Sequence, residues 1–378
     1  MPPSSSALGR WLRGLWRRGD GTRTQDPPAA RTHVVLLDGT LSSLEPGFET
    51  SIGLIYRLLE RETGHSVYYE PGIEWRGWRH VAEVMAGVGI NLQIRRAYTF
   101  LARRYEPGDR VYLLGYSRGA YAVRALAGMI DRVGLLRAEH SSDSRVEEAY
   151  DHYREDPTTP AARSFAARYC HTRAGIAAVG AFDTVQAVGI RWPVLWRLFP
   201  EVHAFRSHRL GRAVDRGFHA MALDETRNAY ALERWRTHGD RTASVEQVWF
   251  RGTHGDVGGH LGGRAGSRPL ANVSLRWMLG RMAATGLDLP ADWRDRFPAD
   301  PDAPSVGNWR GFGWVFLSRA RRVTGRDASE TVHPSAKGHP NAGGLPVWTP
   351  DPGAAPVVRP STSASRPATR SNRPQPSE

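Results

Sequence analysis

The sequence predicts an α/β fold in which a mostly parallel sheet is covered by helices on both faces. Short runs of β-branched and other apolar residues recur along the chain, and segments with apolar residues at helical spacing separate them. The apolar runs lack the alternation that is typical of half-exposed strands, so both faces of each strand should be buried. In such a sheet the ligand site lies at the carboxyl ends of the strands.

Each predicted element has its own pattern. Strands are predicted at 33–37, 110–114, 174–182 and 247–250, where apolar residues follow one another. Helices are predicted at 50–60, 91–104, 118–133 and 272–285 from apolar residues spaced three and four apart. A loop signal, Asp38-Gly39-Thr40, follows the first strand, and the turn signal Pro107-Gly108-Asp109 precedes the second.

One domain, residues 32–343, should hold all these elements. The flanking segments, 1–31 and 344–378, are rich in Pro, Ser, Gly, Ala and Arg and lack a periodic apolar pattern. Segments of this composition have little apolar surface to bury, so we predict that both are disordered. The N-terminal segment has six arginines and two aspartates, a net charge of +4.

The overall charge points only weakly to a partner. The chain carries a net charge of +13 with 51 Lys and Arg residues, of which only Lys337 is a lysine. Because the arginines are spread along the chain rather than gathered in a patch, we predict no nucleic-acid partner. The basic N-terminal segment, with Trp11 and Trp16 among its arginines, could make a peripheral contact with an anionic membrane.

Other classes are excluded by what the sequence lacks. The single cysteine, Cys170, cannot form an intramolecular disulfide or a Cys-rich zinc site. No apolar run approaches the roughly 18 residues of a membrane span. Arginines and glycines interrupt the apolar stretch that a signal peptide would need. We therefore expect a cytoplasmic protein, and export without a cleaved signal stays open. The cysteine count leaves a zinc site of His and carboxylate ligands open, but the serine chemistry inferred below needs no metal or other cofactor, so we expect none.

The main chemical motif is Gly115-Tyr116-Ser117-Arg118-Gly119, which follows a predicted strand and opens a predicted helix. This is the setting of a nucleophile elbow, a turn so tight that only small residues fit two positions before and after the serine. The alternative interpretation is a glycine-rich turn in which Ser117 merely caps the helix.

A serine nucleophile needs a histidine base that is held by a carboxylate. In sheets of this kind the order along the chain is Ser, then Asp or Glu, then His. Asp183 ends one predicted strand, and His254 follows the next, among four nearby glycines that we interpret as room for close approach of a substrate. Asp183 could otherwise cap a helix, and Asp256 is a rival acid that could instead fix the loop around His254.

An oxyanion hole should complete the site. The backbone N–H of Arg118, directly after the proposed nucleophile, is one expected donor. The loop after the first strand is placed to supply a second donor, from the N–H of Gly39 or of Thr40. Asp38 in that loop is a supporting residue, and no phosphate-binding glycine-rich motif accompanies it to indicate a nucleotide site.

Several blocks of this sequence, including the motifs above, resemble those of the α/β-hydrolase family of type VI secretion phospholipase effectors and their bacterial and fungal relatives. The resemblance covers about residues 33–335 in order, through the blocks at 37–40, 98–109, 115–128, 182–185, 218–225, 249–259 and 332–335. It implies an α/β-hydrolase fold and a serine esterase that, in some relatives, is a lipase acting on phospholipid.

Three functions are therefore weighed. The first is hydrolysis of carboxylic esters, with lipid or phospholipid acyl esters as the expected substrates, by Ser117, Asp183 and His254. The second is a cytoplasmic thioesterase or small-ester esterase with the same residues. The third is a non-catalytic protein of this fold that binds a membrane or a partner.

Overall fold

The computed structural model describes residues 30–40, 42–72, 88–185, 208–237, 244–309 and 317–350. The segments predicted to be disordered, 1–31 and 344–378, lie outside the described residues except for 30–31 and 344–350.

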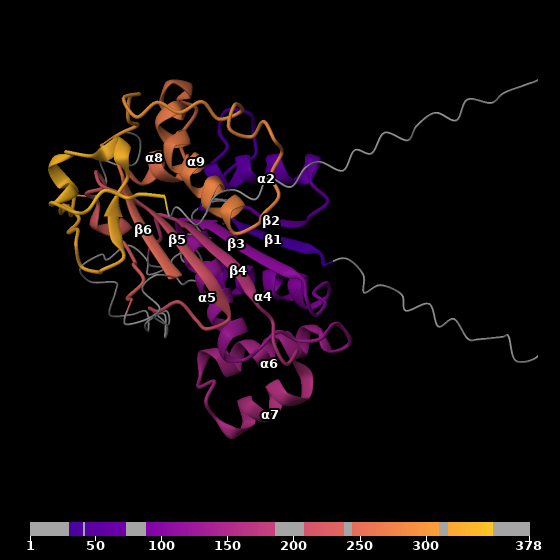
Figure 1. The fold of residues 1–378 in the computed structure, drawn as a ribbon. Coiled ribbons are helices and arrows are strands. Elements are labelled where there is room, and N and C mark those ends of the chain that lie inside the picture. The colour runs from indigo at the N-terminus through magenta and orange to yellow at the C-terminus, as the bar shows by residue number, and fades with distance from the viewer. Residues whose placement is uncertain are drawn as a thin grey trace, which may run out of the picture.

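A seven-stranded parallel sheet forms the centre of the described chain (Figure 1), in the order β2-β1-β3-β4-β5-β6-β7. The strands are β1 (Thr32–Leu37), β2 (Ser66–Glu70), β3 (Arg110–Tyr116), β4 (Ile176–Phe182), β5 (Val214–Ala222), β6 (Val245–Phe250) and β7 (Glu330–Val332). The parallel α/β fold predicted from the sequence is confirmed. Because every strand runs the same way, the loops after them gather at one edge of the sheet.

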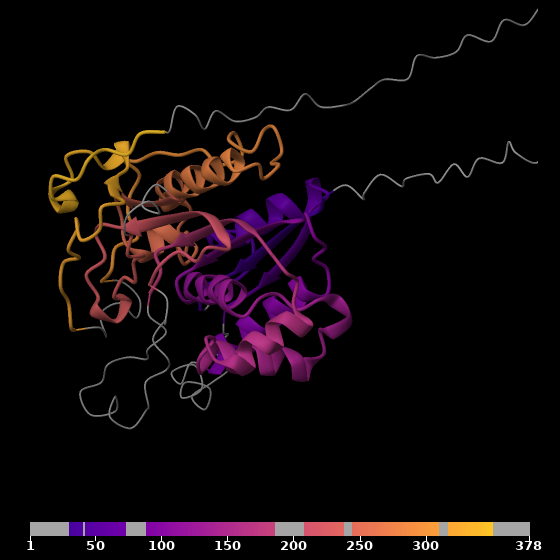
Figure 2. The same cartoon turned by 60° about the horizontal axis from the view of Figure 1, so that its bottom comes forward.

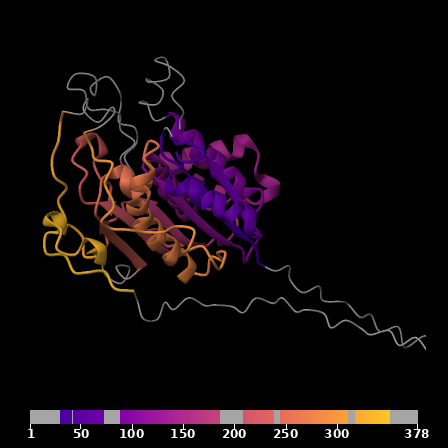
Figure 3. The ribbon, with the colours of Figure 1, turned by 90° about the horizontal axis from the view of Figure 1, so that it is seen from above.

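Helices cover both faces of the sheet. One face carries α2 (Ser51–Glu62) and α9 (Arg268–Ala284), which lie together across the strands in Figure 3. The other carries α4 (Val88–Ala102) and α5 (Arg118–Arg132), with α6 (Asp143–Arg154) and α7 (Pro160–Tyr169) packed outside them (Figure 2). A short helix, α8 (His254–Gly258), follows β6 at the carboxyl edge.

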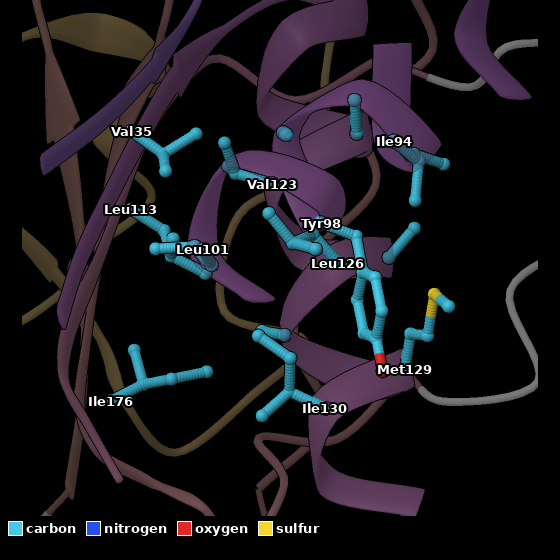
Figure 4. Close-up of a cluster of buried hydrophobic side chains, with 14 of the residues drawn as sticks. Val35, Ile94, Tyr98, Leu101, Leu113, Val123, Leu126, Met129, Ile130 and Ile176 are labelled. Carbon is cyan, nitrogen blue, oxygen red and sulfur yellow. The ribbon is translucent and has the colours of Figure 1, made fainter. Parts of the chain in front are cut away.

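The apolar runs of the sequence are explained by this double cover. Val34 and Leu36 of β1 pack in the cluster with α2 and α9, whereas Val35 and Leu37 pack in the cluster with α4 and α5. Figure 4 shows the second cluster, in which side chains of the strands meet side chains of both helices; the labelled ones are Val35, Leu113, Ile176, Ile94, Tyr98, Leu101, Val123, Leu126, Met129 and Ile130. A strand buried on both sides has no polar face, so alternation disappears.

The four predicted strands and four predicted helices are all present, with ends that differ by a few residues. The helix predicted to start at residue 50 begins at Ser51, because the Thr50 side chain accepts a hydrogen bond from the Gly53 N–H at 3.1 Å and thus caps it. Strands β2, β5 and β7 were not predicted.

The described chain continues through residue 350, seven residues into the C-terminal segment that begins at residue 344. Val347 forms a parallel bridge with Val332 of β7. The Trp348 indole N–H donates to Glu246 at 2.8 Å, and its ring meets Trp277 edge to face. Leu345, Val347 and Trp348 pack against the hydrophobic clusters and thus dock this segment on the edge of the sheet. No helix within the described residues is long and apolar enough to cross a membrane.

Candidate active site

Ser117 stands between β3 and α5 in a strained backbone conformation. Its φ is 57° and its ψ is −121°, a combination that residues other than glycine rarely adopt. The glycines on either side make the turn possible. A Cβ on Gly115 would lie 2.4 Å from the carbonyl oxygen of Gly119, and a Cβ on Gly119 would lie 2.1 Å from that of Leu37. The turn therefore has the tight geometry expected of a nucleophile elbow.

The structure brings His254 to Ser117. His254 is the first residue of α8, at the carboxyl end of β6. Its Nε2 lies 2.9 Å from Ser117 Oγ, and its Nδ1 lies 2.6 Å from Asp183 Oδ2. Because a carboxylate only accepts hydrogen bonds, Nδ1 carries the proton and donates, which leaves Nε2 as the acceptor for the serine hydroxyl.

Asp183 is fully buried at the end of β4, and it too has a positive φ, of 44°. Its Oδ1 accepts a hydrogen bond from the Ala222 N–H at 2.9 Å, and the Arg322 guanidinium contacts both carboxylate oxygens, at 2.5 and 2.9 Å. Burial by itself raises the pKa of Asp183, but the charge of Arg322 and the hydrogen bond from His254 outweigh burial and hold this pKa well below its usual range. The group is therefore a carboxylate at neutral pH.

Two tyrosine rings pack against the imidazole, and a tyrosine hydroxyl and a glutamate hold the backbone of His254. The rings of Tyr116 and Tyr230 lie with their centroids 4.8 and 4.7 Å from that of His254. The Tyr116 hydroxyl donates to the backbone carbonyl of His254 at 3.2 Å, and the buried Glu225 carboxylate accepts from the backbone N–H of His254, also at 3.2 Å. The ring is thus held so that only its Nε2 side meets Ser117.

The loop after β1 lies beside the serine, since a Cβ on Gly39 would be 3.2 Å from Ser117 Cβ. The Gly39 N–H donates to Asp38 Oδ1 at 2.7 Å, so it is already used. Asp38 Oδ2 accepts from the hydroxyls of Thr50 at 2.7 Å and Tyr69 at 3.0 Å. Burial raises the pKa of Asp38 to about 6, against the opposing effect of these hydrogen bonds.

The sequence of the chain matches that of a known protein family. The sequence model of the family described as "T6SS, phospholipase effector Tle1-like, catalytic domain" matches residues 31–281. The chain belongs to this family. The resemblance to type VI secretion phospholipase effectors drawn from the sequence is thereby confirmed.

Individual relatives of this Tle1-like domain share limited identity with it. An uncharacterized protein of the yeast Saccharomyces cerevisiae is 31% identical over 252 residues, which cover 58% of this chain and 36% of the yeast protein. The crystal structure of an uncharacterized Pseudomonas aeruginosa protein is 16% identical with a TM-score of 0.41, covering 79% of this chain and 53% of that one. The Tle1 effector bound to the VgrG spike of the type 6 secretion system is 18% identical with a TM-score of 0.32, covering 61% and 52%.

Asp256 of this Tle1-like domain does not contact the imidazole nitrogens; Asp183 does. Asp256 Oδ2 accepts hydrogen bonds at 2.8 Å from both the N–H and the hydroxyl of Thr253, which forms the N-terminal cap of α8. It also accepts one at 2.5 Å from the Ser305 hydroxyl. Its Oδ1 accepts from the Val306 N–H at 2.9 Å. Asp256 thus fixes the loop that carries His254.

The glycines near His254 are explained by packing within the protein rather than by space for a substrate. Gly252 and Gly259 have positive φ values of 109° and 78°. A Cβ on Gly258 would lie 1.9 Å from the Tyr116 ring, and one on Gly255 would lie 2.8 Å from the His260 carbonyl oxygen. The glycines around the histidine loop are thus required by packing and backbone conformation within the protein.

Three polar residues around the site were missed by the sequence analysis: Arg322, Glu225 and His219. The Nε2 of His219 accepts from the N–H of Thr184, directly after Asp183, at 3.1 Å, and burial lowers the pKa of His219 to about 3, so it is neutral. Glu225 and His219 lie in a block shared with the family, which was the available signal. Arg322 had none, because arginines occur throughout the chain. Among the described residues, no group of three or more His, Cys, Asp or Glu side chains could hold a metal ion.

Proposed function

We propose that the chain is a serine hydrolase that cleaves carboxylic esters of lipids, with phospholipid acyl esters as the main substrate class. The observation that carries the proposal is one continuous hydrogen-bond relay: Ser117 Oγ to His254 Nε2 at 2.9 Å, and His254 Nδ1 to Asp183 Oδ2 at 2.6 Å. Membership in the Tle1-like phospholipase family supports the choice of a lipid ester.

In the proposed first step, Ser117 Oγ attacks the ester carbonyl carbon while its proton passes to His254 Nε2. Asp183 keeps the imidazole in the tautomer that can take this proton and stabilises the imidazolium that forms. The tetrahedral intermediate collapses when His254 gives the proton to the leaving alcohol oxygen, which leaves an acyl-enzyme on Ser117. Water activated by His254 then releases the fatty acid in the reverse sequence.

Backbone N–H groups would stabilise the oxyanion that develops on the carbonyl oxygen. Arg118 supplies one as the first residue of α5, where the helix dipole also favours negative charge. For the second donor we favour Thr40, because the Gly39 N–H donates to Asp38. The proposed chemistry requires no metal or organic cofactor.

The decisive experiment compares Ser117→Ala with the wild-type chain on phospholipid vesicles, a short-chain p-nitrophenyl ester and an acyl-thioester. We expect the wild type to release fatty acid from phospholipid and Ser117→Ala to lose at least about a thousand-fold in rate, as when a nucleophile is removed from such a triad. Ser141→Ala is the matched control, because Ser141 is as buried as Ser117 but lies just before α6, where its hydroxyl donates to the Ala138 carbonyl.

The alternative functions give different results in the same experiment. Preference for the thioester over phospholipid would favour a thioesterase that uses the same residues. A wild-type chain that binds vesicles but neither hydrolyses any ester nor reacts with a fluorophosphonate probe would show that the protein is non-catalytic. Full activity of Ser117→Ala would refute the role of this serine.

A further inference from the structure

Arg322 makes an unusually complete set of contacts with the carboxylate that faces His254. Its Nη1 donates to Asp183 Oδ1 at 2.5 Å and to the Ala222 carbonyl at 3.0 Å. Its Nη2 donates to Asp183 Oδ2 at 2.9 Å and to the Tyr230 carbonyl at 2.8 Å. The side chain of Arg322 is 8% exposed and that of Asp183 is 0% exposed, so the pair is almost free of solvent.

We propose that Arg322 is a positioning residue of this site, which holds the Asp183 carboxylate in line with His254 and offsets its negative charge. The catalytic part of this inference rests on the proposed serine hydrolase function. Arg322 does not contact Ser117 in the structure and acts through Asp183.

The contacts of Asp183 explain why a second anchor is needed. One oxygen accepts from His254 and Arg322, and the other accepts from Arg322 and the Ala222 N–H. A planar guanidinium that spans both oxygens fixes the plane of the carboxylate more firmly than the single donors Ala222 N–H and His254 Nδ1–H, one on each oxygen. The Asp183 backbone, at φ 44°, aims the side chain toward the site, and Arg322 then sets its orientation.

The approach of Arg322 is itself fixed by backbone pairing. Arg319 and Arg227 form an antiparallel bridge, the Ala320 N–H donates to the Thr226 carbonyl at 2.8 Å, and the Asn228 N–H donates to the Ser318 carbonyl at 3.0 Å. The segment before Arg322 is therefore fastened to the segment that carries Tyr230, whose ring packs on His254. The arginine and the imidazole share one supporting framework.

The charge of Arg322 should be visible in the titration of the imidazole. The ionisable groups around His254 are Asp183, Arg322, Tyr116, Tyr230, the pair Glu225 and Arg227, and His260. Asp183 stabilises a protonated imidazole, and the cation beside Asp183 weakens that effect. Removal of the cation would leave the carboxylate uncompensated, so the imidazole would keep its proton to higher pH.

The test compares Arg322→Met, which keeps the length and removes the charge, with Arg322→Lys, which keeps the charge and one point of contact. Two quantities are measured: the pH dependence of kcat/KM for a soluble ester, and the protonation midpoint of the His254 ring by NMR in a Ser117→Ala background. For Arg322→Met we expect kcat/KM to fall by about ten- to a hundred-fold and both the acid limb and the ring midpoint to move up by about one pH unit. For Arg322→Lys we expect both to return to the wild-type pH, with only part of the rate recovered.

Arg281→Met is the matched control, since Arg281 is also 8% exposed and pairs with Glu246 at 2.6 Å, away from His254. It should lower the stability but leave both pH profiles unchanged. If Arg322→Met shows the wild-type pH profiles and loses activity only in proportion to its unfolded fraction, Arg322 is merely structural and the proposal is wrong. The NMR titration does not depend on turnover, so failure of the hydrolase proposal, seen as a wild-type chain inert to every ester, remains distinguishable.

Discussion

Ser117 and Asp183 are the two non-glycine residues with positive φ in the described part of the chain, and both lie in the site. Each backbone of this kind costs roughly 1–3 kcal/mol and persists only where the surrounding structure imposes it. At Ser117 the flanking glycines relieve the crowding, and this was predictable from the Gly-x-Ser-x-Gly spacing. At Asp183 the sequence has no comparable signature, so its position at a strand end was the only indication.

Gly119→Ala tests whether the turn depends on the absence of a side chain. The added Cβ would lie 2.1 Å from the Leu37 carbonyl oxygen in β1, a backbone atom that cannot move aside. We expect the free energy of unfolding in urea to fall by about 1–3 kcal/mol. Gly280→Ala in α9 is the control, because nothing lies within 4 Å of its Cβ position. Alanine there should stabilise the helix by roughly 0.5–1 kcal/mol, and equal effects of the two changes would contradict the prediction.

Among the elements, β1 and its loop link the sheet to the site through one carboxylate. Asp38 accepts hydrogen bonds from the Gly39 N–H in its own loop, from Thr50, which caps α2, and from Tyr69 in β2. Three elements therefore meet at a single buried side chain beside Ser117, and the protonation of that side chain should influence the stability of the whole edge.

We expect Asp38 to make the free energy of unfolding fall as pH rises from about 4 to about 6. Its pKa is raised from 3.8 to about 6 in the folded chain, so over this window the folded state keeps a proton that the unfolded state has lost. The measurement is urea unfolding of the wild type and Asp38→Asn at several pH values. The stability difference, wild type minus variant, should fall across the window and level off above it. Other titrating groups, such as Asp183, are present in both chains, so their contributions cancel in the difference. A difference that stays constant between about pH 4 and 6 would show that Asp38 does not titrate in this window.

The sequence predicts the strands that form an unbroken apolar run, and it misses the two edge strands, β2 and β7, and the interior strand β5, where no such run is present. Each of the four predicted strands has helices packed on both of its faces or lies beside a strand that does. The apolar run of each is therefore unbroken. Strand β2 is half-buried throughout, β5 opens with Val214-Asp215-Arg216-Gly217, and β7 has three residues, so none shows such a run. In the candidate site, the residues whose positions depend on local backbone geometry, such as Ser117 between its glycines, can be predicted from the sequence. Arg322 is 139 positions from Asp183 in the sequence, so no local pattern indicates their contact.

For the whole molecule, the distribution of charge suggests how the proposed lipid hydrolase would reach its substrate. Of the net charge of +13, the first 31 residues carry +4, from six arginines and two aspartates. Trp11 and Trp16 lie among these arginines, whereas the segment from residue 351 onward has four arginines and no aromatic residue. A basic segment with aromatic side chains suits the surface of an anionic membrane better than a basic segment alone.

Replacement of Arg10, Arg13, Arg17 and Arg18 by serine should therefore weaken binding to vesicles that contain phosphatidylserine, by at least about ten-fold, since each arginine near such a surface contributes roughly 1 kcal/mol. The matched control replaces Arg359, Arg366, Arg370 and Arg373 by serine, which also removes four positive charges from the full chain. Co-sedimentation with phosphatidylserine and phosphatidylcholine vesicles at low and high salt measures the effect, which should disappear at high salt because surface charges are then screened.

Hydrolysis of a soluble ester should be unchanged in both variants, because the replaced arginines lie outside the residues that form the relay from Ser117 to Asp183. Equal weakening by the two sets would mean that total charge, rather than the N-terminal segment, governs attraction to the membrane.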